Sequence, residues 1–141
     1  MDFGIEPFKL ASAMQGVIAA RLIRRLCTSC RIEHTPTESE IKMVGDTADQ
    51  FKGEKIFRPG NGCEKCFSSG YSGRLGIHEL LVFDPEIKEL IVNTQDANVI
   101  KKMAISKGMQ TLRESALDKA LQGLTSIEEA ISRTQNELDN D

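Results

Sequence analysis

The sequence predicts a mainly α-helical fold with a small β component, and three observations lead to that prediction. The chain from Asp84 onward carries repeated helix start and stop signals. Only two short segments have strand character, at residues 55–58 and 74–83. Four cysteines fall into two close pairs that can tie the middle of the chain together. A chain of 141 residues suits one small domain, or one and a half, and a metal staple would help it fold.

Composition excludes several classes. The 18 Lys and Arg against 21 Asp and Glu give a net charge of −3, which argues against a nucleic-acid binder on charge alone. With 5% aromatic residues and no Trp, a base-stacking platform is not expected. No apolar run reaches the length of a membrane span, and the acidic N-terminus is not that of a signal peptide. We therefore expect a cytoplasmic protein with reduced thiols.

The first helix is expected to open at Pro7 and to end near Cys27. Its apolar positions recur at helical spacing: Phe8, Leu10, Ala11, Met14, Val17, Ile18, Leu22 and Leu26. Its polar face and the residue just beyond it carry Arg21, Arg24, Arg25 and Arg31. Because the helical pattern begins within a few residues of Met1, we expect a piece of a longer protein.

The middle of the chain has one clear helix signal. Thr37 and Glu40 form a capping-box pattern, and Gly45 can end that short helix. Residues 46–53 are polar and poorly patterned. A strand is expected from Lys55 to Arg58, and a turn at residues 70–73 precedes a second strand from Arg74 to Phe83.

Four helices should follow, each with its own start and stop signals. They are expected from Asp84-Pro85 to about Asn93, from Asp96 to Gly108, from a Thr111/Glu114 capping box to Gly123, and from a Thr125/Glu128 capping box to about Leu138.

Cys27, Cys30, Cys63 and Cys66 are the candidate metal ligands. They form two Cys-x-x-Cys knuckles separated by residues 31–62, and each knuckle brings two thiolates onto one tight turn. Four soft sulfur ligands suit tetrahedral Zn²⁺, and such a closed site is structural because no position is open for water. Three alternatives remain: two disulfides, which a reducing compartment disfavours, a thioredoxin-like redox pair, and a rubredoxin-like iron site.

Several catalytic motifs are absent from the sequence. No Gly-Lys dipeptide occurs, so this chain cannot form a P-loop. The two histidines, His34 and His78, suggest no catalytic arrangement, although His34 could compete as a metal ligand. We therefore expect no enzymatic activity from this chain itself.

The chain resembles the C-terminal part of type II secretion and type IV pilus assembly ATPases over nearly its whole length. The residues that carry the resemblance are Met1–Phe8, Ala11–Ala13, Val17–Cys27, Gly62–Cys66, Gly70–Leu81, Thr111–Arg113, Asp118–Ala120, Gly123–Ser126 and Glu128-Glu129. The Ala20-Arg21 pair departs from the Gln-Arg that relatives often have, which weakens any role assigned through that glutamine.

The resemblance implies an architecture and a function. Residues 1–26 would be the last helix of a truncated RecA-like ATPase core, 27–66 a tetracysteine zinc-binding subdomain inserted after it, and 67–141 a short strand followed by a C-terminal helical bundle. ATP and Mg²⁺ would bind only in the full-length parent, a cytoplasmic hexamer that docks on inner-membrane platform proteins for protein secretion or pilus assembly. The family's zinc ligands carry over to the four cysteines.

The module would stabilise each subunit and transmit motion through an interface. The candidate interface residues are Arg21, Arg24, Arg25, Arg31 and Arg74. A contact with acidic phospholipids through the same basic surface is compatible with that role. The alternative function is a stand-alone four-cysteine zinc-ribbon nucleic-acid-binding module, which the net negative charge and the few aromatic residues disfavour.

Overall fold

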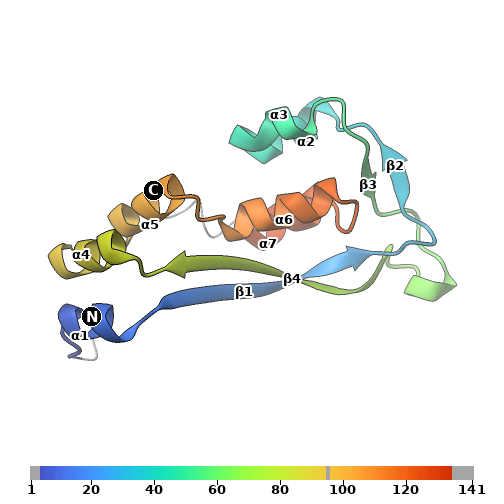
Figure 1. Cartoon of the computed structure of the whole chain (residues 1–141). Helices are drawn as coiled ribbons and strands as arrows, with labels where there is room; N and C mark the ends of the chain where they lie inside the picture. The colour runs from blue at the N-terminus through green and yellow to red at the C-terminus, as the bar shows by residue number, and fades with distance from the viewer. Residues whose placement is uncertain (1–3, 95, 135–141) are drawn as a thin grey trace. The chain divides into compact units, whose positions relative to one another are not determined.

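The computed structural model describes residues 4–94 and 96–134 (Figure 1). In chain order the elements are α1 (Pro7–Ala13), β1 (Gly16–Leu26), β2 (Ile32–His34), α2 (Glu38–Val44), the 3-10 turn η1 (Gly45–Thr47), α3 (Ala48–Phe51), β3 (Ile56–Arg58), the 3-10 turn η2 (Glu64–Cys66), β4 (Tyr71–Val82), α4 (Pro85–Asn93), α5 (Ala97–Ser106), α6 (Leu112–Leu121) and α7 (Ile127–Thr134). The predicted class, mainly helical with a small β component, is confirmed.

The described residues form two compact units. Unit 1 contains the residues up to Ala19 together with His78–Thr111, and unit 2 contains Ala20–Ile77 together with the residues from Leu112 onward. The sequence predicts one bundle for the four C-terminal helices, and these helices are divided between the two units. Helices α4 and α5 belong to unit 1, whereas α6 and α7 belong to unit 2 and pack against each other.

The long N-terminal helix predicted through Leu26 is wrong. Helix α1 ends at Ala13, and residues 16–26 form strand β1. Gly16 explains the break, because glycine disfavours a helix interior and because a Cβ here would lie 2.8 Å from the carbonyl oxygen of Leu81. Val17, Ile18 and Ile23 are β-branched, and they favour a strand once a partner is available.

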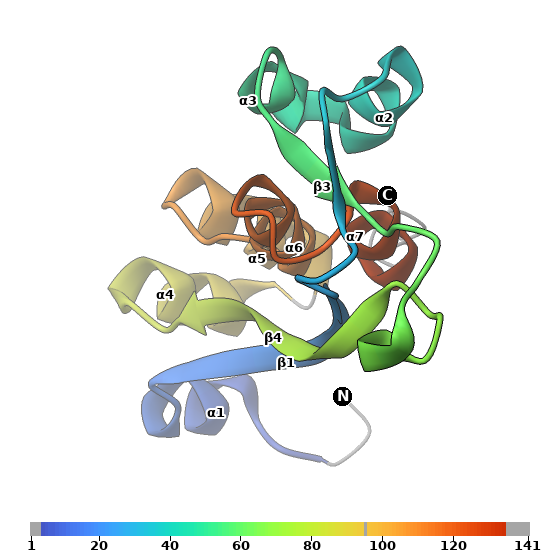
Figure 2. The ribbon, with the colours of Figure 1, turned by 90° about the vertical axis from the view of Figure 1, so that its right-hand side faces the viewer.

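That partner is β4, which begins at Tyr71, so the predicted turn at residues 70–73 is already largely strand. Figures 1 and 2 both show β1 and β4 side by side. The Cys27 N–H donates to the Gly70 carbonyl at 3.0 Å, and the Phe83 N–H donates to the Gln15 carbonyl at 2.9 Å. Because opposite ends of the two strands meet in these bonds, the pair is antiparallel.

The core of unit 1 lies between its helices and the end of β4. Its buried residues are Ala11, Phe83, Ile87, Ile91 and Ala104. Helix α4 begins as predicted, because the Asp84 carboxylate accepts the N–H of Ile87 at 2.9 Å and proline follows at the first helical position. None of the described helices has the length and apolar character that a membrane span requires.

Unit 2 contains a second small sheet beside two short helices (Figure 2). Strands β2 and β3 are antiparallel, with Ile32 opposite Arg58 and His34 opposite Ile56. The predicted capping box of α2 is confirmed, with Thr37 and Glu40 bonded reciprocally. The poorly patterned segment at residues 46–53 contains α3 and most of η1, and its Phe51 is fully buried.

The N-cap of α7 is one residue later than the sequence suggested. Helix α7 begins at Ile127, and the Ser126 hydroxyl accepts the Glu129 N–H at 3.2 Å. The Thr125 hydroxyl is used elsewhere, since it donates to the Arg24 carbonyl at 2.8 Å. The predicted extension of this helix to about Leu138 lies outside the described residues beyond Thr134.

Candidate metal centre

The first knuckle follows directly from the end of β1. The Arg31 N–H donates to the Cys27 carbonyl at 2.9 Å, and the Cys30 N–H donates to the same oxygen at 3.3 Å. These bonds close a tight turn over Thr28 and Ser29, and the turn brings the two thiols to the same side of the chain. The end of a strand is a more precise support for a ligand side chain than a free loop is.

The second knuckle is the 3-10 turn η2. The Cys66 N–H donates to the Cys63 carbonyl at 3.1 Å, and Phe67 and Ser68 then adopt left-handed φ angles of 50° and 59°. Gly62 precedes the turn, and a Cβ at that position would run into the Ser68 backbone. Glycine is therefore required at Gly62 because the chain passes itself closely.

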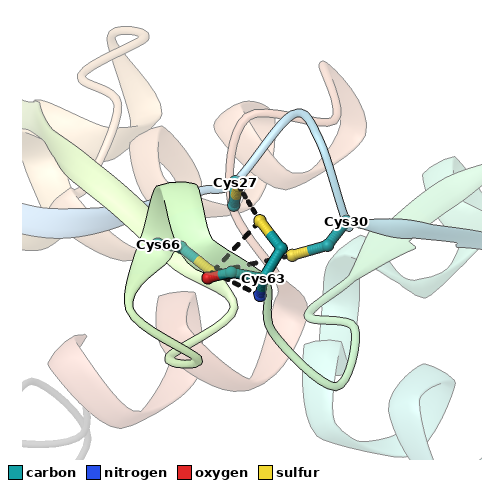
Figure 3. Close-up of side chains that lie close together, drawn as sticks. All are labelled: Cys27, Cys30, Cys63 and Cys66. Atoms are coloured by element: carbon teal, nitrogen blue, oxygen red, sulfur yellow. Dashed lines mark hydrogen bonds between the residues drawn. The ribbon is translucent and has the colours of Figure 1, made fainter.

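The two knuckles bring all four sulfur atoms together (Figure 3). The Sγ–Sγ distances are 3.8 Å for Cys27 to Cys63, 3.8 Å for Cys30 to Cys66 and 3.7 Å for Cys63 to Cys66. All four sulfurs lie within 4.8 Å of one another. A tetrahedral metal with metal–sulfur distances of about 2.3 Å has sulfur–sulfur edges of about 3.8 Å. The cluster thus fits one tetrahedral ion.

The same distances exclude the disulfide alternative in this structure. All four cysteines are free, and a disulfide needs a sulfur–sulfur distance of about 2.05 Å. His34 is not part of the cluster either. Its Nε2 lies 2.9 Å from the Glu40 carboxylate, which already caps helix α2. The chemistry of the donor set is therefore that of four thiols and no imidazole.

The protein environment divides the thiols into easily and poorly ionised ones. Burial acts to raise the pKa of Cys66, but the backbone N–H groups of Cys63 and Gly70 outweigh it and hold this pKa at about 6. Hydrogen bonding from the Ser29 backbone likewise lowers the pKa of Cys27. Burial raises the pKa of Cys30 to about 12. Metal binding requires thiolates, so a cation held by these four sulfur atoms would compete with protons for them.

Comparison with known proteins assigns the family. The family of Type II/IV secretion system proteins matches residues 1–132. The chain belongs to this family. The type IV pilus assembly ATPase PilB of Thermus thermophilus is 44% identical over 133 residues, which are 94% of this chain and 15% of the relative. Type II secretion system protein E of Dickeya dadantii is 41% identical over 136 residues, 96% of this chain and 26% of the relative.

Both branches of the family thus occur among the relatives. The PilB of Pseudomonas aeruginosa, for example, is 35% identical over 92% of this chain and 22% of its own length. This secretion-family chain spans about a quarter or less of these curated relatives.

Arg31 anchors the first knuckle to the loop between α6 and α7. Its Nη1 donates to the Gly123 carbonyl at 2.6 Å, and its guanidinium lies 4.0 Å from the centre of the Phe57 ring. Gly123, predicted only as a helix stop, has a φ of 72° and packs closely on that ring, since a Cβ would lie 2.7 Å from Phe57. The cysteine cluster is therefore attached to the helical part of unit 2.

Arg24 makes the most extensive polar contact of the predicted basic residues. Its backbone N–H, Nε and Nη2 all donate to the Glu129 carboxylate, at 3.0, 2.8 and 2.6 Å. The Glu129 side chain is 0% exposed and the Arg24 side chain 50% exposed. The guanidinium also lies 4.1 Å from the Tyr71 ring centre, and the Tyr71 hydroxyl lies 2.9 Å from Ser126 Oγ. These contacts join both long strands to α7.

Sequence reasoning missed Glu129, because a Glu in the first turn of a helix ordinarily faces solvent. Burial acts to raise the pKa of Glu129, but the hydrogen bonds and charge of Arg24, with help from Arg133, hold the pKa below its ordinary range. The shift in the helix start explains the error, since Glu129 then follows the N-cap by three positions. The available signal was the spacing of Glu129 four residues before Arg133, which places the two side chains on the same face of a helix.

The remaining predicted interface residues differ in their surroundings. The Arg21 guanidinium donates to the Arg133 carbonyl at 2.9 Å. Arg25 and Arg74 are exposed on β1 and β4. His78, also exposed on β4, lies away from the cysteine cluster in sequence and is not among its ligands.

Proposed function

We propose that this chain is the non-catalytic, zinc-binding C-terminal module of a hexameric ATPase that drives type II secretion or type IV pilus assembly. The observation that carries the proposal is a tetrahedral set of four thiols in a chain of the secretion family. The module stabilises its subunit and presents a surface through which ATP-driven motion reaches neighbouring subunits.

The metal we assign is structural zinc, held by Cys27, Cys30, Cys63 and Cys66. Bound Zn²⁺ supplies a cross-link between the end of β1 and the η2 turn, and a four-sulfur site leaves no open position for substrate or water. Iron in the same geometry remains the chemical competitor. The chain contributes the ligands, and the contacts of Arg31 and Arg24 connect them to α6 and α7.

ATP and Mg²⁺ would bind elsewhere in the parent protein, because this chain has no P-loop sequence. ATPase activity is what the names of the relatives state for those proteins. We extend it to the parent of this chain, with cytoplasmic location and peripheral attachment to the inner membrane through platform proteins.

The proposed interface surface is basic. Arg25 and Arg74 are its exposed members, while Arg21, Arg24 and Arg31 are partly engaged within the chain. This surface suits an acidic patch on a neighbouring subunit or a platform protein, and it suits acidic phospholipid headgroups. The nucleic-acid alternative is not retained, because two of its basic residues, Arg24 and Arg31, are bonded inside the chain.

Metal analysis and assembly of the full-length parent test the proposal together. We expect one zinc ion per chain, and we expect Cys63→Ser to lose zinc and to weaken hexamer formation and ATPase activity. Thr28→Ala is the matched control: it alters a residue within the first knuckle but leaves all four cysteines in place, and it should retain zinc. Protein purified without chelators that contains iron or no metal would refute the zinc assignment. Normal hexamers of the zinc-free variant would refute the assembly role.

Charge reversal tests the interface separately. In the full-length parent, Arg74→Glu should weaken oligomers or platform binding, because it reverses an exposed charge that makes no internal ion pair with the described residues. Arg24→Glu should also weaken them, but through loss of the Glu129 contact as well. Unchanged assembly of Arg74→Glu would count against the basic surface.

A further inference from the structure

A cavity of about 230 Å³ opens beside the first knuckle, and its polar lining consists of cationic side chains, hydroxyl groups and the Cys27 thiol. Arg25 and Lys65 contribute the two cations, and Thr28, Ser29 and Ser72 contribute three hydroxyl groups. No Asp or Glu lines the cavity. We propose that this cavity binds a phosphate group.

The backbone geometry explains why these residues converge. Arg24 and Arg25 are successive residues of β1, so their side chains leave opposite faces of the strand. Arg24 is directed to Glu129, which leaves Arg25 on the other face. The hydrogen bond from the Cys27 N–H to the Gly70 carbonyl sets the register of the two strands. Arg25, two residues before Cys27, therefore lies opposite Ser72, two residues after Gly70. Lys65 joins them from the second knuckle.

The polar groups of the cavity have no competing partner in the described part of the chain. Neither Arg25 nor Lys65 forms an ion pair there, and no described residue bonds the hydroxyls of Thr28, Ser29 or Ser72. Arg31, by contrast, is already bonded to Gly123. Two available cations with adjacent hydroxyl donors are the chemistry that recognises phosphate oxygens, through charge-assisted hydrogen bonds.

A competing explanation assigns the same cations a different task. Four thiolates with one divalent metal carry a charge of −2, and Arg25 and Lys65 would balance it without binding any ligand. That explanation accounts for the charges but requires neither a cavity between them nor the three hydroxyls on its wall. The cavity needs folded knuckles, and hence the metal, but it does not need the proposed ATPase assembly.

Amide NMR of the zinc-loaded chain, titrated with inorganic phosphate at constant ionic strength, tests the proposal. We expect saturable shifts at Thr28, Ser29 and Ser72. Arg25→Gln and Lys65→Gln should each weaken binding by about tenfold, the effect of one charge-assisted bond. Arg58→Gln is the matched control, because it removes an exposed positive charge of unit 2 outside the cavity and should leave the affinity unchanged. Zinc content is measured for each variant.

A second arm separates a free phosphate from a lipid headgroup. Vesicles of phosphatidylcholine with phosphatidic acid are compared with pure phosphatidylcholine in co-sedimentation. Binding of inorganic phosphate that depends on Arg25 identifies a soluble phosphate ligand. Binding to phosphatidic acid alone, again lost in Arg25→Gln but not in Arg58→Gln, identifies the headgroup. If neither probe binds in a way that depends on Arg25, while every variant retains zinc, the phosphate site is refuted and the zinc module stands.

Discussion

The buried Glu129 carboxylate should be a major stabilising group of unit 2, and Glu129→Gln tests this. The substitution keeps the size of the side chain but removes its charge. Wild-type Glu129 accepts three bonds from Arg24 and one, at 3.2 Å, from Arg133. A Gln can accept only through its single oxygen, and its NH₂ group would face the guanidinium donors of Arg24.

The expected loss can be worked out from these contacts. A hydrogen bond to a charged group contributes about 1.5–3 kcal/mol, and breaking a fully buried ion pair costs about 3–5 kcal/mol. The Arg24 side chain is 50% exposed, so water compensates for part of the loss on its side. We therefore expect Glu129→Gln to reduce the free energy of unfolding by about 2–3 kcal/mol.

Urea unfolding of the zinc-loaded chain measures this loss. Tyr71 is the only tyrosine and there is no Trp, so its fluorescence reports on the residues around Arg24. The midpoint should fall by about 1 M urea or more. Glu128→Gln, one position earlier and exposed, is the matched control and should change stability by less than about 0.5 kcal/mol. Equal effects of the two substitutions would refute the role assigned to Glu129.

The pH dependence has a definite sign. The folded state holds the pKa of Glu129 below its unfolded value, so folding favours the ionised carboxylate. Its contribution is fully present above the ordinary carboxyl pKa of about 4.3 and is lost as the pH falls through the folded pKa. Acid also protonates the thiolates in both proteins, so the difference between wild type and Glu129→Gln is the quantity to follow. A difference that stays constant from neutral pH to pH 3 would contradict the argument.

Three further predictions concern unit 2. Cys63→Ser should reduce hydrogen-exchange protection around the knuckles and in α6 and α7, because Arg31 and Arg24 connect these parts. Helices α4 and α5 of unit 1 should stay protected. Unchanged protection in α6 and α7 would show that the knuckles unfold independently. Gly123→Ala should lower the free energy of unfolding in urea by about 2–3 kcal/mol, because the new Cβ sits on a left-handed backbone and also clashes with Phe57. Gly53→Ala is the control: its φ is 79° but the space around it is open, so the loss should be only about 1 kcal/mol. Tyr71→Phe should lower the free energy of unfolding, followed by circular dichroism, by about 1 kcal/mol, because the hydrogen bond to Ser126 is lost. An unchanged free energy of unfolding would mean that water fully replaces this bond.

At β1 the apolar pattern alone does not predict the conformation of the chain. The apolar residues of this segment recur every three or four positions, which is the spacing of a helix face. In the structure Ile23 and Leu26 are buried while Ile18 and Leu22 remain exposed, so the spacing does not describe one buried helical face. Pairing with β4, more than 40 residues away in sequence, decides the conformation. No local signal reports such a partner.

The helix starts at α2, α4 and α5 were predictable for the opposite reason. Each is determined by a side chain that bonds a backbone N–H two or three residues away, such as Thr37, Asp84 or Asp96. At α7 two adjacent residues, Thr125 and Ser126, were both competent caps. The choice fell to Ser126 because Thr125 bonds the Arg24 carbonyl of a distant strand.

The sequence by itself determined the four clustered cysteines, the capped helices and the resemblance to the secretion family, because each depends on residues close together in the chain or on a spacing that chemistry requires. Only the tertiary structure decided that residues 16–26 are a strand, that the C-terminal helices divide between two units, and that Arg24 and Arg31 bind within the chain. Those outcomes depend on burial and on hydrogen-bond partners far apart in the chain: β1 pairs with β4, Arg24 bonds Glu129 and Arg31 bonds Gly123. Contacts at that separation leave no periodic trace in the sequence, since either partner alone resembles an ordinary surface residue.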